Sequence, residues 1–326
     1  MAAFDVVRAA HGELLVADLG RARAFYCDLL GFVETEATRD ALYLRGYEDI
    51  VHHSLVLRRA AAPGCGHIAY RVAGPEDVEA AARWFAGQGC VVRRVAAGEE
   101  PGQGPAVRVQ DPLGFPVEFY ASMAPAERLL QRFDLHRGAV PLRLDHFNLH
   151  VPDAAVADRY YREGLGFRCA EYTDAGGEVW ASWLHRKDNV HDVAVMNGPG
   201  PRLHHLGFTV GEPMSVIRAC DVLAGAGREA AIERGPGRHG ISNAFFLYLR
   251  DPDGNRIELF AGDYLTADPD MPPLRWSIDD PRRQTFWGHA APSSWFDEAM
   301  LVESVDTGAL LALQPPRLRD RPDFVT

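Results

Sequence analysis

The feature that most constrains this chain of 326 residues is an internal repeat. Four segments of the first half recur in the second half at offsets of 135 to 140 residues: 11–18 with 146–153, 25–32 with 160–167, 67–72 with 205–210, and 111–118 with 251–258. Because the offset drifts by only a few residues, we expect the insertions to be loops. The sequence therefore predicts a duplicated unit of about 120 residues.

Each copy shows the pattern of a strand, a helix and several strands, followed by the same series again. In the second copy, the apolar extended stretch 146–151 leads to Asp153, a typical N-cap for a helix that reaches Gly164. The second series follows with elements expected at 205–210, 213–225, 244–250 and 256–260. The predicted fold class is α+β, with two tandem domains that each contain two βαβββ modules.

The repeat also sets the expected boundaries. We expect a first domain over 1–120, a linker over 121–141, a second domain over 142–262 and an extension over 263–326. The linker is predicted to contain one or two helical turns between Pro125 and Phe133. The extension is rich in Pro, Asp, Arg and Trp, and we expect it to pack over a domain as a candidate lid.

The composition excludes several classes of protein. Hydrophobic residues make up 47% and charged residues 24%, as in ordinary globular proteins. A net charge of −11 without a basic run argues against partners such as nucleic acid or an anionic membrane. Five scattered cysteines without a CxxC pair fit a reducing cytosol. No apolar run is long enough to span a membrane and no signal peptide is recognisable, so a cytoplasmic protein is expected.

A candidate metal site lies in the second copy. His146, His205 and Glu258 fall on three predicted strands, and two histidines with one carboxylate form the facial triad of non-haem Fe(II) enzymes. A histidine on an apolar strand is more often a core residue, but these three stand at equivalent points of related modules. His204 is adjacent to His205, and the alternation of side chains along a strand predicts that it points to the other side.

A longer pattern surrounds Glu258. The stretch from Gly237 to Glu258 (GRHGISNAFFLYLRDPDGNRIE) fits the signature of extradiol ring-cleavage dioxygenases throughout. With its duplicated modules, the chain resembles the type I extradiol dioxygenases of the vicinal oxygen chelate superfamily. Further segments resemble those members that act on homoprotocatechuate (3,4-dihydroxyphenylacetate): 143–148, 183–192, 200–205, 232–240 and 280–288. The resemblance covers both predicted domains and thins out after about residue 303.

The resemblance implies a reaction and a set of residues. It implies that a carboxylated catechol is cleaved next to its diol, with O2 as co-substrate, to a 2-hydroxymuconate semialdehyde. The implied metal is Fe(II), or alternatively Mn(II), bound by His146, His205 and Glu258, and the implied assembly is a homotetramer. The other implied roles are an acid/base for His191, donors to the substrate oxygens for Tyr248 and His239, the lining of the oxygen and ring pocket for Asn148 and Trp183, and binding of the substrate carboxylate for Arg234 and Arg283.

Other interpretations stay open. His191 could make a structural hydrogen bond, Tyr248 and Trp183 could fill the core, and the two arginines could be surface ion-pair partners, with Arg238 and Arg282 as competing choices. The same fold could serve an extradiol dioxygenase for another catechol, a glyoxalase-like metal isomerase or a metal-free binding module. A hydrolase is disfavoured because the sequence has no GxSxG motif.

The first copy carries an apparent second metal site. The repeat places His11, His67 and Glu118 at the ligand positions, and His52 opposite His191. However, the counterparts of Tyr248 and His239 are Arg108 and Glu99, so the supporting groups are gone. We expect a remnant of the duplication that binds no metal.

Overall fold

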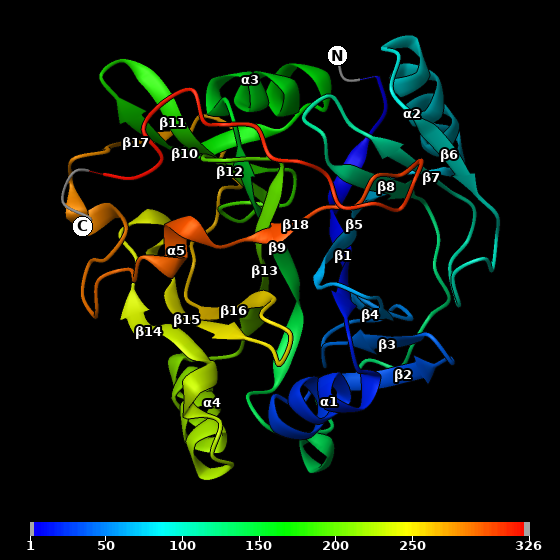
Figure 1. Ribbon diagram of the computed structural model, residues 1–326, viewed down its shortest axis with the longest axis vertical. Coiled ribbons are helices and arrows are strands. Elements are labelled where there is room, and N and C mark those ends of the chain that lie inside the picture. Colours follow the sequence, from blue (N-terminus) through cyan, green and yellow to red (C-terminus); the bar gives the residue numbers. More distant parts are fainter. Residues whose placement is uncertain (1–2, 323–326) are drawn as a thin grey trace.

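The computed structural model describes residues 3–322, and residues 1–2 and 323–326, at the outer ends of the predicted first domain and extension, lie outside the described residues. Two mixed β-sheets, one in each half of the chain, dominate the structure (Figure 1). The first half contains β1 (Val6–Val16), α1 (Leu19–Arg23), η1 (Ala24–Leu29), β2 (Val33–Ala37), β3 (Ala41–Arg45), β4 (Leu55–Arg59), β5 (Gly64–Val72), α2 (Pro75–Gly87), β6 (Val92–Val95), β7 (Ala106–Gln110) and β8 (Pro116–Tyr120).

The second half repeats this order. It contains β9 (Pro141–Val151), α3 (Ala154–Arg159), η3 (Tyr160–Gly164), β10 (Arg168–Ala175), β11 (Glu178–His185), β12 (Val193–Asn197), β13 (Arg202–Val210), α4 (Pro213–Gly225), η4 (Glu229–Ala231), β14 (Ile232–Arg238), η5 (Ile241–Asn243), β15 (Phe245–Arg250) and β16 (Arg256–Ala261). The helix predicted after Asp153 begins there, because the Asp153 side chain accepts hydrogen bonds from the backbone N–H groups of Ala155 and Val156.

The two modules of each half join through their first strands. β1 pairs antiparallel with β5, and β9 pairs antiparallel with β13. The last strand of a module lies parallel to its first strand, as β16 does beside β13. The predicted α+β fold of two tandem halves, each with two βαβββ modules, is confirmed. Within residues 3–322, no helix has both the length and the apolar character needed to cross a membrane.

The predicted helix in the linker is wrong. The stretch from Pro125 is extended, and only a short 3-10 turn, η2 (Phe133–Leu135), is helical. The backbone N–H groups of Ala126 and Leu129 donate to the carbonyls of Ile50 and Tyr47, at 2.9 and 2.8 Å. These tertiary hydrogen bonds to a loop of the first half use donors that a local helix would otherwise need, so the linker follows the surface of that half.

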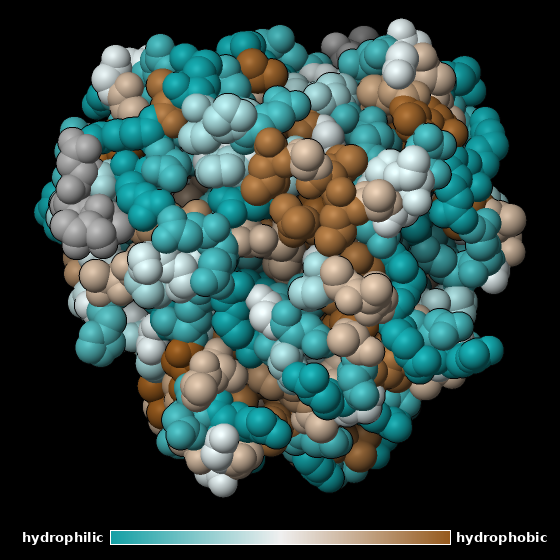
Figure 2. Space-filling view, in the orientation of Figure 1, coloured by the Kyte–Doolittle hydropathy of each residue, from teal (hydrophilic) through white to brown (hydrophobic). Residues whose placement is uncertain are grey.

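The extension packs along both halves. Its strand β17 (Leu274–Ser277) adds to the edge of β10, and β18 (Met300–Leu301) pairs with β13. Between them lie η6 (Pro281–Arg283) and α5 (Ser294–Asp297), and further on Glu303 binds Arg58 of the first half at 2.5 Å. Figure 2 shows apolar side chains gathered at the centre of the face that this segment crosses. The extension therefore holds the two halves together, and its role as a lid stays a prediction.

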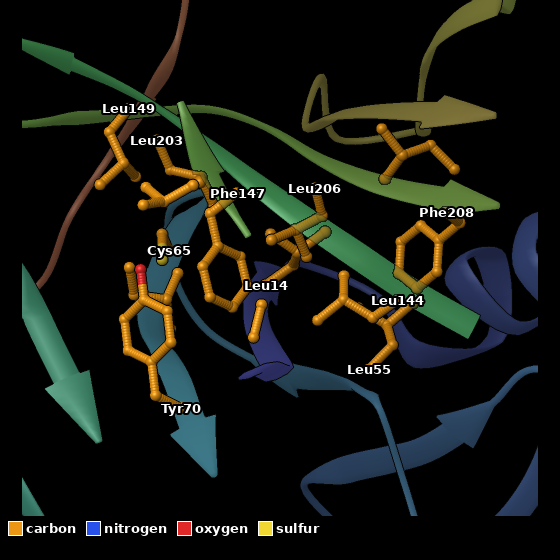
Figure 3. Packing of buried hydrophobic residues seen from close by; sticks show 14 of the residues in the cluster. Leu14, Leu55, Cys65, Tyr70, Leu144, Phe147, Leu149, Leu203, Leu206 and Phe208 are labelled. Atoms are coloured by element: carbon orange, nitrogen blue, oxygen red, sulfur yellow. The ribbon is translucent and has the colours of Figure 1, made fainter. Parts of the chain in front are cut away.

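The main hydrophobic core lies between the two sheets (Figure 3). Phe147 of β9 meets Tyr70 of β5 edge to face, with ring centroids 5.4 Å apart. Leu206 of β13 approaches β1 so closely that a Cβ on Gly12 would lie 2.8 Å from its Cδ1. Phe147 and Leu206, which are paired across β9 and β13, occupy the core face. Because strand side chains alternate, His146, directly before Phe147, faces the other way.

We expect Phe147→Ala to lower the free energy of unfolding by about 3–5 kcal/mol, because it removes a fully buried ring from the contact between the halves. Phe133→Ala is the matched control, since Phe133 is 76% exposed, and should change stability by less than about 0.5 kcal/mol. Urea unfolding of both variants measures the difference. Equal midpoints for the two variants would contradict the assignment of the core.

Candidate metal centre

Three donor atoms converge on the open face of the second sheet. His146 Nε2 lies 3.0 Å from Glu258 Oε2 and 3.2 Å from His205 Nε2, and His205 Nε2 lies 3.2 Å from Glu258 Oε2. All three side chains are buried. The structure thus brings together the three residues that the sequence predicts as ligands.

The size of this triangle suits a six-coordinate metal ion. Two ligands bound about 2.1 Å from an ion at right angles to each other lie about 3.0 Å apart. The three measured edges are close to that value. Imidazole nitrogens and a carboxylate oxygen also form a donor set that Fe(II) and Mn(II) accept. The residues present therefore fit such an ion.

A gap in a row of side chains makes room for the triangle. Four strands place Tyr248, Glu258, Gly207 and His146 side by side on one face of the sheet. Gly207, in the middle of the row, leaves space that the ring of His146 uses, because a Cβ at this position would lie 2.2 Å from His146 Cε1. A larger residue at 207 would push the ring away from Glu258.

The charges at the site favour an ionised carboxylate. Burial alone would raise the pKa of Glu258, but the neighbouring His146 and His205 outweigh this effect and hold the pKa well below its usual value. On the far side of the ring, His146 Nδ1 donates to Asp145 Oδ2 at 3.1 Å, which leaves Nε2 for the site. Asn189 donates to the other oxygen of Asp145 at 2.8 Å. Asp145 is not among the predicted site residues, although its position directly before a predicted ligand was a usable signal.

The prediction that His204 points away from His205 is wrong. The register of β13 against β9 shifts between Leu203 and His205, so His204 sits at a β-bulge. The bulge breaks the alternation of side chains and brings His204 Nδ1 within 2.7 Å of His205 Nδ1. His204 lies outside the donor triangle but contacts a member of it.

Except for Arg234, the remaining predicted site residues line one cavity. Its lining includes His146, Asn148, Trp183, His191, His205, His239, Tyr248, Glu258 and Arg283. The His191 ring lies against the His146 ring, with centroids 4.0 Å apart, and stands in the loop just before β12 rather than in a strand. Burial holds the pKa of His191 well below its usual value, and its Nδ1 is buried without a hydrogen-bond partner. His191 is therefore a neutral base.

His239 and Tyr248 bind each other. His239 Nδ1 donates to the carbonyl of Gln284, so in the neutral ring Nε2 accepts from the Tyr248 hydroxyl at 2.8 Å. Burial lowers the pKa of His239 to about 3 and raises that of Tyr248 well above its usual value. Both groups are therefore neutral at pH 7, and the rotatable Tyr248 hydroxyl is the proton donor of the pair.

Two arginines are buried beside this cavity. Arg283 lines it. The Arg234 guanidinium lies over the rings of Trp295 and Tyr248, 4.4 and 5.9 Å from their centroids. Burial lowers the pKa of each to about 10, so both stay charged at neutral pH. Nε and Nη1 of Arg234 and Nε and Nη2 of Arg283 are buried and have no hydrogen-bond partner. The other two arginines considered for binding the carboxylate already have partners. Arg282 is exposed and bound to Asp280, and Arg238 donates to a backbone carbonyl.

The extension supplies lining residues that sequence analysis did not place, Gln284 and Trp295. Trp295 packs edge to face on Tyr248, with centroids 4.3 Å apart. The tryptophan-rich composition of the extension was the only signal available, and it gave no position.

The equivalent group in the first half differs in its electrostatics. His11 Nε2 lies 3.0 Å from His67 Nε2, but Glu118 Oε1 lies 3.6 and 4.0 Å from these atoms. Arg108 binds Glu118 at 2.6 Å and places its guanidinium 3.4 Å from His67 Nε2. A guanidinium thus supplies the positive charge that faces this carboxylate. His52, the counterpart of His191, is hydrogen-bonded with Glu36 at 3.1 Å.

Paired βαβββ modules with a buried triad of two histidines and one carboxylate define a metal-binding protein of the vicinal oxygen chelate fold. The chain belongs to the Glyoxalase/Bleomycin resistance protein/Dioxygenase superfamily, whose family model matches residues 8–119 and 143–259.

Sequence relatives include a manganese-dependent 2,3-dihydroxybiphenyl 1,2-dioxygenase of Geobacillus genomosp. 3, 34% identical over 87% of this chain and 94% of the relative. A metapyrocatechase of Geobacillus stearothermophilus is 35% identical over 90% of this chain and 93% of the relative. Among solved structures, homoprotocatechuate 2,3-dioxygenase of Brevibacterium fuscum, in complex with 3,4-dihydroxyphenylacetate, superposes with a TM-score of 0.93 at 42% identity, covering 96% of this chain and 98% of that one. The enzyme of the same name from Arthrobacter globiformis superposes with a TM-score of 0.93 at 44% identity, covering 96% of this chain and 97% of that one.

We expect Gly207→Ala to lower the affinity for Mn²⁺ at least about tenfold, because the new Cβ displaces the His146 ring from the triangle. Gly211→Ala is the matched control, since a Cβ there meets nothing within 4 Å. Equilibrium dialysis of metal-free protein against Mn²⁺ gives both the affinity and the number of ions per chain. We expect one ion per wild-type chain, and a count of two would contradict the prediction for the first half.

Proposed function

We propose that this protein is an extradiol dioxygenase that cleaves homoprotocatechuate, a catechol with a carboxylate side chain, next to its diol. One molecule of O2 is consumed, and both of its atoms enter the product, a 2-hydroxymuconate semialdehyde. The observation that carries the substrate class is a pair of buried guanidinium groups with unpartnered N–H donors, of which Arg283 lines the cavity that contains the donor triangle. A buried cation without a partner is costly, and a substrate carboxylate would supply that partner.

His146, His205 and Glu258 would hold the metal, which we propose to be Fe(II), with Mn(II) as the alternative. When bound, the ion supplies a Lewis acid for the catechol oxygens and a redox link between the electron-rich ring and O2. The relatives support both the reaction class and the metal alternative, since one is a manganese-dependent 2,3-dihydroxybiphenyl 1,2-dioxygenase.

The chain's own residues would move the protons. His191 is neutral, so one of its ring nitrogens has a lone pair that can take a proton from a catechol hydroxyl and return it later in the reaction. Tyr248, supported by His239, can turn its hydroxyl from that ring towards a substrate oxygen. Asn148 and Trp183 would bound the space for the ring and O2.

Arg234 and Arg283 would set the orientation of the substrate. Charge-assisted hydrogen bonds from the planar guanidinium groups would hold the acetate carboxylate at the end of the cavity formed by the extension. The diol would then face the donor triangle. An apolar catechol would leave both guanidinium groups unpaired, so the site should discriminate against it.

We also propose a homotetramer in the cytosol. The five cysteines are free thiols, which is the form expected in a reducing compartment.

We expect anaerobic loading with Fe(II), followed by homoprotocatechuate and air, to give one O2 consumed per substrate and a yellow product. His191→Phe is the matched variant: it should keep the metal and the substrate affinity but lose at least about a hundredfold in turnover, because the proton acceptor is gone. An oxygen electrode and visible absorbance measure both. Binding of catechol without O2 uptake, with Fe(II) and with Mn(II), would contradict the proposal and favour a glyoxalase-like isomerase or a binding module.

We expect Arg283→Leu to raise KM for homoprotocatechuate about 10- to 100-fold, because a charge-assisted hydrogen bond is worth about 1.5–3 kcal/mol. KM for 4-methylcatechol, which has no carboxylate, should change less than about threefold. Arg282→Leu removes the neighbouring exposed arginine and should affect neither substrate. Equal effects of Arg283→Leu on both catechols would rule out the carboxylate assignment.

A further inference from the structure

We propose that the backbone carbonyl of Trp295, acting through His204, fixes the proton and the ring orientation of the candidate ligand His205. His204 Nε2 lies 2.9 Å from the Trp295 carbonyl oxygen, and His204 Nδ1 lies 2.7 Å from His205 Nδ1. The chain of contacts thus runs from the C-terminal extension through the β-bulge to the donor triangle. We call these three groups the histidine relay, and His204 is its positioning residue.

The chemistry of the contacts sets the direction of each hydrogen bond. A carbonyl oxygen only accepts, so His204 Nε2 carries a proton and donates it to Trp295. Within residues 3–322, no carboxylate binds His204, and the Arg256 guanidinium lies 3.3 Å from its backbone carbonyl. Nothing there stabilises a second proton on the buried ring, so His204 is neutral and its Nδ1 has a lone pair.

The second bond of the relay follows from the first. Since His204 Nδ1 can only accept, His205 must donate its Nδ1–H across the 2.7 Å contact. A neutral imidazole has one N–H, so His205 Nε2 keeps its lone pair. That atom is the one that lies 3.2 Å from Glu258 Oε2. The relay therefore selects the tautomer and the ring angle that metal binding requires.

The carbonyl at the start of the relay is held in place from the sheet. Arg256 of β16 is fully buried and donates to the carbonyls of Ser294 and Glu298, on either side of Trp295, at 3.1 and 3.0 Å. Its charge is balanced by Glu233 at 2.5 Å. The same strand carries Glu258, so ligand and carbonyl are fixed to one element.

The first half provides an internal comparison. The position equivalent to His204 is Gly66, and His67 Nδ1 forms no hydrogen bond, with Glu13 Oε1 3.6 Å away. The position equivalent to Asp145 is Ala10, and His11 Nδ1 is likewise unpartnered. The half that lacks both partners is the one in which an arginine faces the carboxylate. Of the two halves, only the second gives both Nδ1 atoms a hydrogen-bond partner, and only there is the carboxylate not paired with an arginine.

Two substitutions of His204 test the two hydrogen bonds of the relay separately. His204→Asn keeps an acceptor oxygen near the Nδ1 position but loses the donor to Trp295. His204→Gln keeps a donor near the Nε2 position but loses the acceptor for His205. The affinity of the full-length protein for Mn²⁺ and the rate of metal loss to a chelator are the readouts, with thermal unfolding as a check on folding.

We expect His204→Gln and His204→Leu to lower Mn²⁺ affinity about 10- to 100-fold and to speed metal loss, while His204→Asn stays within about threefold of wild type. KM for the catechol per metal-loaded site should not change, because His204 is not itself among the residues that line the cavity. An affinity for His204→Gln equal to wild type, or one for His204→Asn as low as for His204→Leu, would overturn the relay.

His150→Leu controls for the loss of a buried imidazole. His150 packs against His204, with ring centroids 4.7 Å apart, and its Nδ1 is hydrogen-bonded with Arg202 rather than with His205, so the variant should keep its Mn²⁺ affinity. A loss as large as that of His204→Leu would show that packing, rather than the relay, sets the affinity. The inference rests on the proposed metal site but not on the substrate: wild type that binds Mn²⁺ and consumes no O2 would contradict the dioxygenase alone.

Discussion

The antiparallel pairing of β9 with β13 is the interaction on which the rest of the structure depends. Its register sets His146 opposite Gly207 and His205 opposite Asn148, which places all of these residues on the open face. The same register sets Phe147 opposite Leu206 on the reverse face, where both pack against the first half. The hydrophobic free energy of that core therefore holds the donor atoms in position, because a slip of one residue would exchange the two faces.

The first half contributes to the site although it holds no part of the donor triangle. Asp192, directly after His191, is fully buried and accepts from the backbone N–H of Ala9 in β1 at 2.7 Å. It also accepts from the backbone of Arg186 and from Lys187 Nζ. The loop that carries His191 is thus fastened to the other half of the molecule. Duplication gives the second half a rigid surface against which this loop is ordered.

Local signals made much of the fold and site predictable. The repeat, the Asp153 cap and the long stretch before Glu258 identify modules, helix and candidate ligands without knowledge of contacts. Strand β14 was not predicted, because Gly235, Pro236 and Gly237 interrupt it and such residues usually end a strand. The linker was mispredicted because its hydrogen-bond acceptors lie in another part of the chain. His204 was mispredicted because a bulge depends on the register of two strands, which one strand's sequence does not contain.

The two halves carry the same three donor residues in different surroundings. Both halves keep two histidines and a glutamate at equivalent points, and both bury them. In the row where the second half has Tyr248, Glu258, Gly207 and His146, the first half has Arg108, Glu118, Ala69 and His11. In the first half, Ala69 fills the gap and Arg108 replaces the tyrosine. The triangle of donor atoms there is wider, and the Glu118 carboxylate already forms an ion pair with Arg108. What separates the halves is therefore the set of neighbours that orient the rings, leave space between them and keep the carboxylate free of an internal cation.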